Sequence, residues 1–121
     1  MDEPNPPTSV DLPGLAARER GQGVVWSAPG TTDMHINLVR LEPGGDIGAH
    51  VNSEVEVLIV GVSGEGVVGV DGRDVTLVPS ALVVIPKGAR RAVAAGPAGP
   101  RAYLSIQRAR GGLQIKPAAG R

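Results

Sequence analysis

Short valine-rich runs, separated by glycine and proline, fill the middle of the chain. Runs of this length, bounded by turn-forming residues, are typical of β-strands. Only residues 12–19 could form a short helix, and Gly21 ends it. The pattern therefore predicts an all-β domain, either a sandwich or a barrel. The predicted strands lie at residues 23–27, 34–42, 47–52, 54–61, 66–70, 74–78, 81–86, 90–95 and 101–108.

The clearest local signal is an Asp-Gly pair between two strand-like runs. A valine-rich run ends at Val70, Asp71 and Gly72 follow, and a second run extends to Val78. Both central residues of a type I′ turn adopt a positive φ, and Asp-Gly is a preferred pair for these positions. The sequence therefore predicts a two-residue β-hairpin here.

The composition excludes several classes of function. The chain has 121 residues, enough for one domain, and it has no cysteine, which excludes disulfides, zinc ribbons, iron–sulfur clusters and thiol nucleophiles. Trp26 and Tyr103 are its only aromatic residues, too few to stack the bases of single-stranded nucleic acid. No apolar run has the length of a membrane-spanning helix, and the acidic, proline-rich start is unlike a secretory signal. We expect a cytoplasmic protein that binds neither a membrane nor nucleic acid.

The charges divide the chain into two halves. Residues 1–74 contain all 12 acidic residues and four Arg, a balance of −8, and residues 75–121 carry the opposite balance, +8. A basic half can bind nucleic acid. It can also belong to a fold that pairs early strands with late ones, so that opposite charges meet. The basic residues are scattered among strand-like segments, which favours the second interpretation.

The first of two informative motifs lies between residues 43 and 64. Pro43-Gly44-Gly45 leads to His50, Asn52 and Glu56, and an apolar run precedes Gly64. The spacing resembles the first motif of the small single-domain cupins. In that motif a Gly is followed after five residues by His-x-His, and then by a Glu and a closing Gly. Here Asn52 stands at the position of the second His, and the closing Gly comes one residue late.

The second motif runs from Ser80 to Arg91 and resembles the second cupin motif. That motif consists of Gly, five residues, Pro-x-Gly, two residues and His. Pro86 and Gly88 match it, whereas Ser80 stands at the position of the first Gly and Arg91 at that of the His. The resemblance covers residues 40–108 and is fairly specific for the fold.

The resemblance implies a jelly-roll β-barrel, also called a double-stranded β-helix, with a pocket at one mouth. We expect the barrel domain at residues 21–110, an N-terminal tail or arm at 1–20 and a C-terminal tail at 111–121. The resemblance also implies a homodimer, and the segment at 24–26, Val-Val-Trp, could pair across the two subunits.

Metal-binding cupins hold iron, manganese, nickel or zinc on three His and one Glu. This chain has two histidines, His35 and His50, so a three-His site cannot form. His50 and Glu56 could supply two ligands and Asn52 a weak third, but Arg91 would repel a cation. We therefore expect no metal or other cofactor. A divalent transition metal ion on His50 and Glu56 is the alternative, and the facing of His35 is left open.

The even-numbered residues from His50 to Glu56 are polar and share one face of a regular strand. This alternation is ordinary for a half-exposed strand. The same face becomes apolar at Leu58 and Val60, so we expect it to enter a core. A polar patch at the rim of an apolar interior is also typical of a binding pocket.

Arg91 allows two interpretations, because the resemblance places it beside the strand that carries His50. In the first, a Glu56–Arg91 ion pair closes the vacated metal site. In the second, Arg90 or Arg91 acts with His50 and Asn52 to hold an anionic or polyol ligand, because a guanidinium can donate two parallel hydrogen bonds. The neighbouring Arg90 is expected to face outward.

The sequence thus predicts a cupin-fold protein that binds a small polar or anionic molecule at the barrel mouth. The expected ligand-binding residues are His50, Asn52, Glu56, Arg91 and Tyr103. The alternative is a cupin enzyme with His50 and Glu56 as catalytic candidates. It would be a metal-dependent oxygenase or isomerase, or a metal-free acid–base isomerase in which Tyr103 is the partner of His50.

Overall fold

The computed structural model describes residues 6–109. This part of the chain forms one short helix followed by nine strands. The helix is α1 (Leu12–Arg18). The strands are β1 (Gly23–Ser27), β2 (Met34–Leu41), β3 (Asp46–Val51), β4 (Val57–Ser63), β5 (Gly66–Val70), β6 (Arg73–Leu77), β7 (Leu82–Ile85), β8 (Arg90–Ala95) and β9 (Arg101–Arg108).

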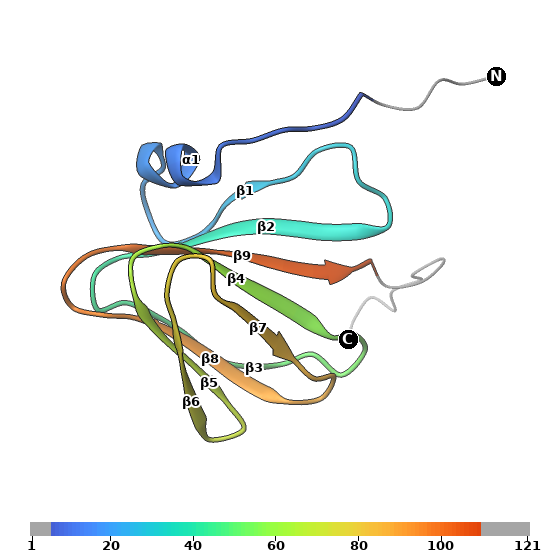
Figure 1. Cartoon of the computed structure of the whole chain (residues 1–121). Coiled ribbons are helices and arrows are strands. Elements are labelled where there is room, and N and C mark those ends of the chain that lie inside the picture. The colour runs from blue at the N-terminus through green and yellow to red at the C-terminus, as the bar shows by residue number, and fades with distance from the viewer. Residues whose placement is uncertain (1–5, 110–121) are drawn as a thin grey trace.

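The strands form two antiparallel sheets that face each other (Figure 1). The larger sheet has the order β1-β2-β9-β4-β7, and the smaller has the order β3-β8-β5-β6. Consecutive strands therefore alternate between the sheets at several points, as they do in a jelly roll. The predicted jelly-roll β-barrel is confirmed.

The two halves of the chain interleave, as the charge pattern predicted. Strand β9 lies between β2 and β4, and β8 lies between β3 and β5. Each late, basic strand thus has early strands on both sides. The Asp71-Gly72 hairpin is also confirmed, because both residues have a positive φ, +50° and +83°, and Val70 pairs with Arg73.

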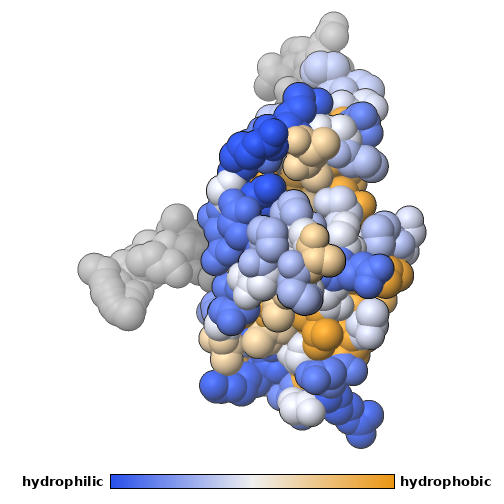
Figure 2. Space-filling model, turned by 90° about the vertical axis from the view of Figure 1, so that its left-hand side faces the viewer, coloured by the Kyte–Doolittle hydropathy of each residue, from blue (hydrophilic) through white to orange (hydrophobic). Residues whose placement is uncertain are grey.

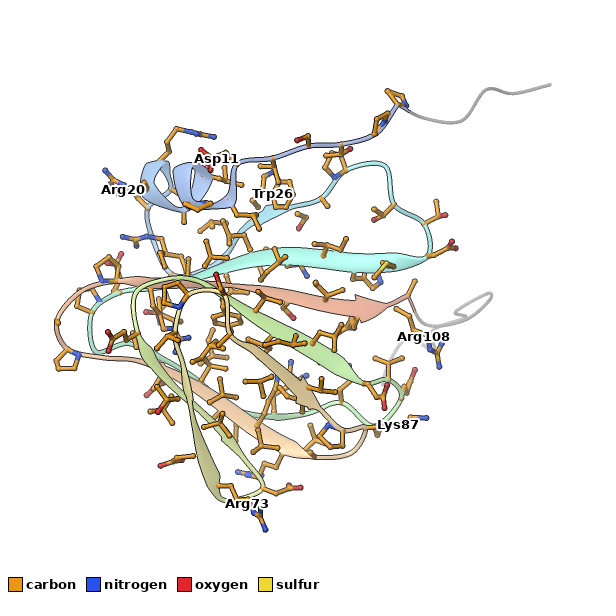
Figure 3. The ribbon with its side chains drawn as sticks, in the orientation of Figure 1. Asp11, Arg20, Trp26, Arg73, Lys87 and Arg108 are labelled. Carbon is orange, nitrogen blue, oxygen red and sulfur yellow. The ribbon has the colours of Figure 1, made fainter. Side chains whose placement is uncertain are left out.

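Side chains fill the space between the sheets (Figure 3). The buried interior is built from aliphatic residues of both sheets together with Tyr103. Its fully buried members include Leu41, Ile59, Leu77 and Val93. In Figure 3, Lys87 and Arg108 lie at one end of the barrel. Figure 2 shows the opposite end, whose surface is mostly hydrophilic with hydrophobic residues gathered toward one side.

A second apolar cluster lies on the outer face of the larger sheet, beneath α1 (Figure 1). Leu15 and Ala16 of the helix are buried against Leu38 and Ala102 of the sheet. The predicted N-terminal arm at 1–20 therefore includes a helix that packs on the barrel. The predicted tail at 111–121 lies outside the described residues.

The predicted dimer segment is divided between two environments. Val25 and Trp26 pack against the cluster beneath α1. Val24, by contrast, is 60% exposed on the edge strand β1. Helix α1, the one helix within residues 6–109, has seven residues and is too short to span a membrane.

Ser80 adopts a φ of +73° in the turn before β7, at the position where the cupin motif has glycine. Residues with a Cβ atom rarely adopt this left-handed backbone conformation, because the Cβ comes too close to the neighbouring carbonyl oxygen, whereas glycine adopts it readily. We expect Ser80→Gly to raise the free energy of unfolding by about 0.5–1 kcal/mol, measured by urea denaturation. Asp71→Gly is the matched control. It should give no gain, since the Asp71 carboxylate accepts a hydrogen bond from the Arg90 backbone N–H at 2.9 Å. A Ser80→Gly protein less stable than the wild type would contradict the argument.

Candidate functional site

A cavity of about 490 Å³ opens into the barrel between the two sheets. This volume lies within the usual range for small-molecule sites. Its walls combine apolar residues, several neutral polar residues and one permanently charged residue, Arg91. The lining residues are Gly23, Val24, Asn37, Val39, Ile47, Gly48, Ala49, His50, Ile59, Arg91, Ala92, Val93, Tyr103, Ser105 and Gln107.

Strand alternation places the polar residues of the larger sheet in the cavity. Tyr103, Ser105 and Gln107 occupy alternate positions of β9 and therefore share its inner face. On β2, Asn37 pairs with Ser105, and the Asn37 side-chain oxygen accepts a hydrogen bond of 2.6 Å from the Ser27 hydroxyl. This wall of the cavity consists of neutral hydrogen-bonding groups.

A β-bulge shapes the opposite wall. Ile47 of β3 pairs with Val93 of β8, and His50 pairs with Arg91. Three steps along β3 thus match two steps along β8, which is the signature of a bulge. As a result, both Ile47 and His50 reach the cavity lining, and the predicted proximity of His50 and Arg91 is confirmed.

Arg91 carries a charge that no described residue compensates. Its Nη1 atom is buried without a hydrogen-bond partner, and no ion pair joins it to a carboxylate among the described residues. Burial lowers the pKa of Arg91 from its ordinary value, because the charged form loses hydration. A buried N–H group without an acceptor costs free energy, so this guanidinium can bind an acceptor that residues 6–109 do not supply.

Tyr103 belongs both to the cavity wall and to the buried interior. Its side chain is 5% exposed, and burial raises the pKa of the phenol. The positive charges of Arg91 and Arg101 act on the Tyr103 pKa in the opposite direction, but burial has the larger effect. Tyr103 is therefore a neutral phenol at neutral pH, and it lines the cavity.

Asn52 has a structural role in the turn between β3 and β4. Its side-chain oxygen accepts hydrogen bonds from the backbone N–H groups of Glu54, at 3.0 Å, and Val55, at 3.1 Å. Its backbone carbonyl accepts another from Gly88, at 2.8 Å. Asn52 is buried, and its side-chain amide nitrogen donates a long hydrogen bond of 3.5 Å to the side-chain oxygen of Gln107. Asn52 therefore contacts the cavity residue Gln107 but is not itself among the residues that line the cavity.

We expect Asn52→Ala to lower the free energy of unfolding by about 1–3 kcal/mol, because the buried N–H of Val55 loses its acceptor. Asn52→Asp keeps an oxygen in the same place and should stay within about 1 kcal/mol of the wild type. Chemical denaturation of the three proteins measures the difference. Equal stability of the alanine variant and the wild type would contradict this role.

Glu56 lies apart from the other predicted site residues. It is exposed and lines a second hollow with Met34, Leu58, Ile106, Gln107 and Arg108, of which Gln107 also lines the main cavity. No ion pair between Glu56 and Arg91 is present among the described residues. The regular alternation predicted from His50 to Val60 is wrong, because the chain turns at residues 52–56. The turn reverses the facing of β4, and Val57 and Ile59 enter the core in place of Leu58 and Val60.

His35 is exposed at the start of β2 and pairs with Gln107 of β9. It is not among the residues that line the cavity. Arg90 is exposed, as predicted. The structure therefore brings together His50, Arg91 and Tyr103 of the predicted site residues.

The donor set does not fit the metal of the metal-binding cupins. His50 on β3 pairs with Arg91 on the neighbouring strand β8. The Asn52 side chain forms hydrogen bonds within its own turn, and Glu56 lines another hollow. Among residues 6–109, no group of three or more His, Asp or Glu side chains could hold a metal ion. The absence of a cofactor stays a prediction.

Three polar residues of the cavity were missed from the sequence, namely Asn37, Ser105 and Gln107. The available signal was alternation, since Ser105 and Gln107 share parity with Tyr103. The strand that contains Asn37 had no predicted site residue from which to count. The Asn37 side chain faces the cavity because Asn37 pairs with Ser105, and this pairing cannot be read from the sequence.

Comparisons with known proteins agree with this architecture. A family model for the cupin domain matches residues 37–106, more than half of the chain. No match to a curated protein is found.

Solved structures superpose on the barrel. The protein TT1209 from Thermus thermophilus is 26% identical, with a TM-score of 0.70 over 85% of this chain and 98% of that one. A cupin protein from Bacteroides fragilis is 24% identical, with a TM-score of 0.62 over 69% and 71% of the two chains. A sugar phosphate isomerase of the cupin superfamily from Silicibacter pomeroyi is 24% identical, with a TM-score of 0.61 over 66% of this chain and 53% of that one. Together with the family match, the shared fold shows that the chain belongs to the cupin family.

Proposed function

We propose that this protein binds a small anionic molecule in the mouth of its barrel, through Arg91. The observation that carries the proposal is the charge of the cavity. Arg91 is its one permanently charged lining residue, and no Asp or Glu lies among the described residues of its wall. A guanidinium without a carboxylate partner favours an oxyanion, which it can hold with two parallel hydrogen bonds.

The neutral polar groups of the wall support the same kind of ligand. Ser105, Gln107 and Tyr103 extend along one strand of the cavity, and His50 lies beside Arg91. Hydroxyl and amide groups can donate hydrogen bonds to carboxylate, phosphate or hydroxyl oxygens. We infer that they orient the ligand after the charge of Arg91 attracts it.

The apolar part of the wall strengthens this attraction. Val39, Ile59 and Val93 line the cavity and belong to the buried interior. Charge interactions are stronger where apolar walls limit water. The ligand therefore needs a compact body, and a single oxyanion group with a few carbon atoms satisfies these conditions.

The geometry does not favour acid–base catalysis by His50 and Glu56 as a pair. A general acid and a general base must both reach the reacting group, and these two residues line different hollows. We therefore propose ligand binding in preference to an enzyme that depends on this pair.

Thermal unfolding with added anions tests the proposal. A ligand that binds only the folded protein raises the melting temperature with increasing concentration. We expect acetate, succinate or phosphate to give a saturable increase, beyond that of sodium chloride at equal ionic strength, and glycerol to give none. Equal effects of all the salts would show ionic strength alone and would contradict the proposal.

A further inference from the structure

A second arginine is buried in the barrel. Arg101 is 1% exposed at the start of β9, on the same inner face as Tyr103. Its Nη1 donates a hydrogen bond of 2.8 Å to the carbonyl of Ala94, and its Nη2 donates one of 3.3 Å to the carbonyl of Leu77. Its Nε atom is buried without a partner. Within residues 6–109, the guanidinium of Arg101 has two neutral acceptors and no carboxylate partner.

The fold provides space for this guanidinium through glycine. At Gly66, a Cβ atom would overlap Nη1 of Arg101. At Gly64, a Cβ atom would meet the Cα and Cβ atoms of Arg101 at 2.8 and 2.9 Å. A buried charge is costly unless it is paired. Here two glycines leave space for the Arg101 guanidinium, and no carboxylate of the described residues pairs with it. The interior of the barrel therefore has a net positive charge at this place.

Tyr103 connects this charge with the cavity. The guanidinium carbon of Arg101 lies 5.7 Å from the centre of the Tyr103 ring, and Tyr103 itself lines the cavity, whereas Arg101 does not. Arg91 stands in the cavity wall. Both positive charges act to lower the Tyr103 pKa against the larger, raising effect of burial, in agreement with their places near its ring. Behind and beside Tyr103 the barrel thus holds two positive charges and no described negative one.

We infer that Arg101 is a second, indirect cation of the binding site, and that the cavity therefore selects doubly charged oxyanions over singly charged ones of the same shape. This inference rests on the proposed function, since it concerns the ligand of the same cavity. The ligand class is a compact dicarboxylate or a phosphate. Arg91 contacts the anion, and Arg101 acts through the low-dielectric interior without touching it, so Arg101 is a positioning residue.

Succinate and its monoamide, succinamate, provide the direct test, because they have nearly the same shape and differ by one charge. Calorimetric titration at about pH 8, where succinate and phosphate are doubly charged, measures both affinities in the wild-type protein. We expect succinate to bind at least about tenfold more tightly than succinamate, the size of one added charge interaction in a partly buried site. Phosphate is the third ligand, and its rank against succinate distinguishes the two sources of the dianion. Equal affinities for succinate and succinamate would overturn the inference and leave the proposed function intact, whereas no binding of any anion would overturn both.

Variants of Arg101 test its part in this selectivity. Arg101→Met keeps the bulk and removes the charge, and we expect the preference for succinate over succinamate to fall by about tenfold. Arg101→Lys keeps the charge and should retain most of the preference. An unchanged preference in a folded Arg101→Met protein would overturn the inference.

Tyr103 gives a readout that does not require a folded variant. It is the chain's one tyrosine, so ultraviolet absorbance reports its ionisation alone. In the wild-type protein, saturating succinate should raise the Tyr103 pKa more than saturating succinamate does, because the bound dianion offsets more of the positive charge around the phenol. Equal shifts would contradict a selective effect of the second charge.

Discussion

Gly66→Ala is expected to destabilise the barrel by about 3 kcal/mol and to lower its melting temperature by roughly 10–20 °C. Gly66 lies in the central strand β5, opposite Ala95 of β8 and Leu77 of β6. An added Cβ would overlap the backbone carbonyl oxygen of Ala94 and the guanidinium of Arg101. Neither group can move away easily, because the two are joined by a hydrogen bond inside the barrel. The strand must therefore shift, and the pairing on both sides is disturbed.

Gly69→Ala is the matched control in the same strand. Its Cβ would meet the Asp74 carboxylate at 3.5 Å and the Ala92 carbonyl at 3.9 Å, which are ordinary contact distances. We expect this variant to unfold within about 1 kcal/mol of the wild type. Thermal and urea denaturation of both variants measures the difference. If Gly66→Ala is as stable as Gly69→Ala, Arg101 does not occupy the place described for it.

Arg91→Met is expected to weaken the binding of succinate or phosphate by about 10- to 100-fold, measured by calorimetric titration. A hydrogen bond between charged groups contributes roughly 1.5–3 kcal/mol, and each 1.4 kcal/mol corresponds to about tenfold in affinity. Methionine keeps an unbranched side chain of similar length but supplies no donor. Arg90→Met is the control, because Arg90 is exposed and adjacent in sequence, and it should bind these anions as the wild type does. Equal losses in the two variants would indicate a general effect of surface charge.

The same Arg91→Met variant should be more stable than the wild type without ligand, by about 1–2 kcal/mol. The reason is that Nη1 of Arg91 is buried without a partner, so its removal relieves a cost and breaks no ion pair. The opposite result is expected if Arg91 closes the site through a structural ion pair, because the partner carboxylate would then be left alone. Urea denaturation in a buffer of low anion content separates these two outcomes.

Most of the fold could be predicted from the sequence because its signals are local. Short valine-rich runs between glycine and proline specify strands, and the Asp71-Gly72 pair specifies a hairpin through its positive φ angles. The opposite charges of the two halves indicated that early and late strands interleave, which the places of β8 and β9 confirm. The jelly-roll arrangement of the strands was an expectation from the family resemblance.

The site was harder to predict, because its facing depends on irregular backbone. Alternation assigned Glu56 to the same face as His50. Residues 52–56 instead form a turn, held by hydrogen bonds to the Asn52 side chain, so the side chains that follow face the other way. The bulge in β3 likewise changes which residues face inward. Neither feature follows from the spacing of polar residues alone.

That Arg91 and Arg101 have no carboxylate partner among the described residues could not be predicted either. The sequence contains 12 acidic residues, and a Glu56–Arg91 ion pair was a reasonable expectation. The charge of the interior depends on where each carboxylate lies in three dimensions. The carboxylates of Glu56 and Asp71 lie outside the cavity wall, the first in another hollow and the second on the Arg90 backbone.

The most direct test of the central claim is a titration of the arginine side chains observed by NMR. Protein labelled with nitrogen-15 gives a signal for the Nε–H group of each arginine, and the Arg91→Met variant assigns that of Arg91. Addition of succinate is expected to shift the Arg91 signal saturably and to leave that of Arg90 nearly unchanged. A folded protein in which the Arg91 signal does not respond to succinate, phosphate or acetate would contradict anion binding at the barrel mouth.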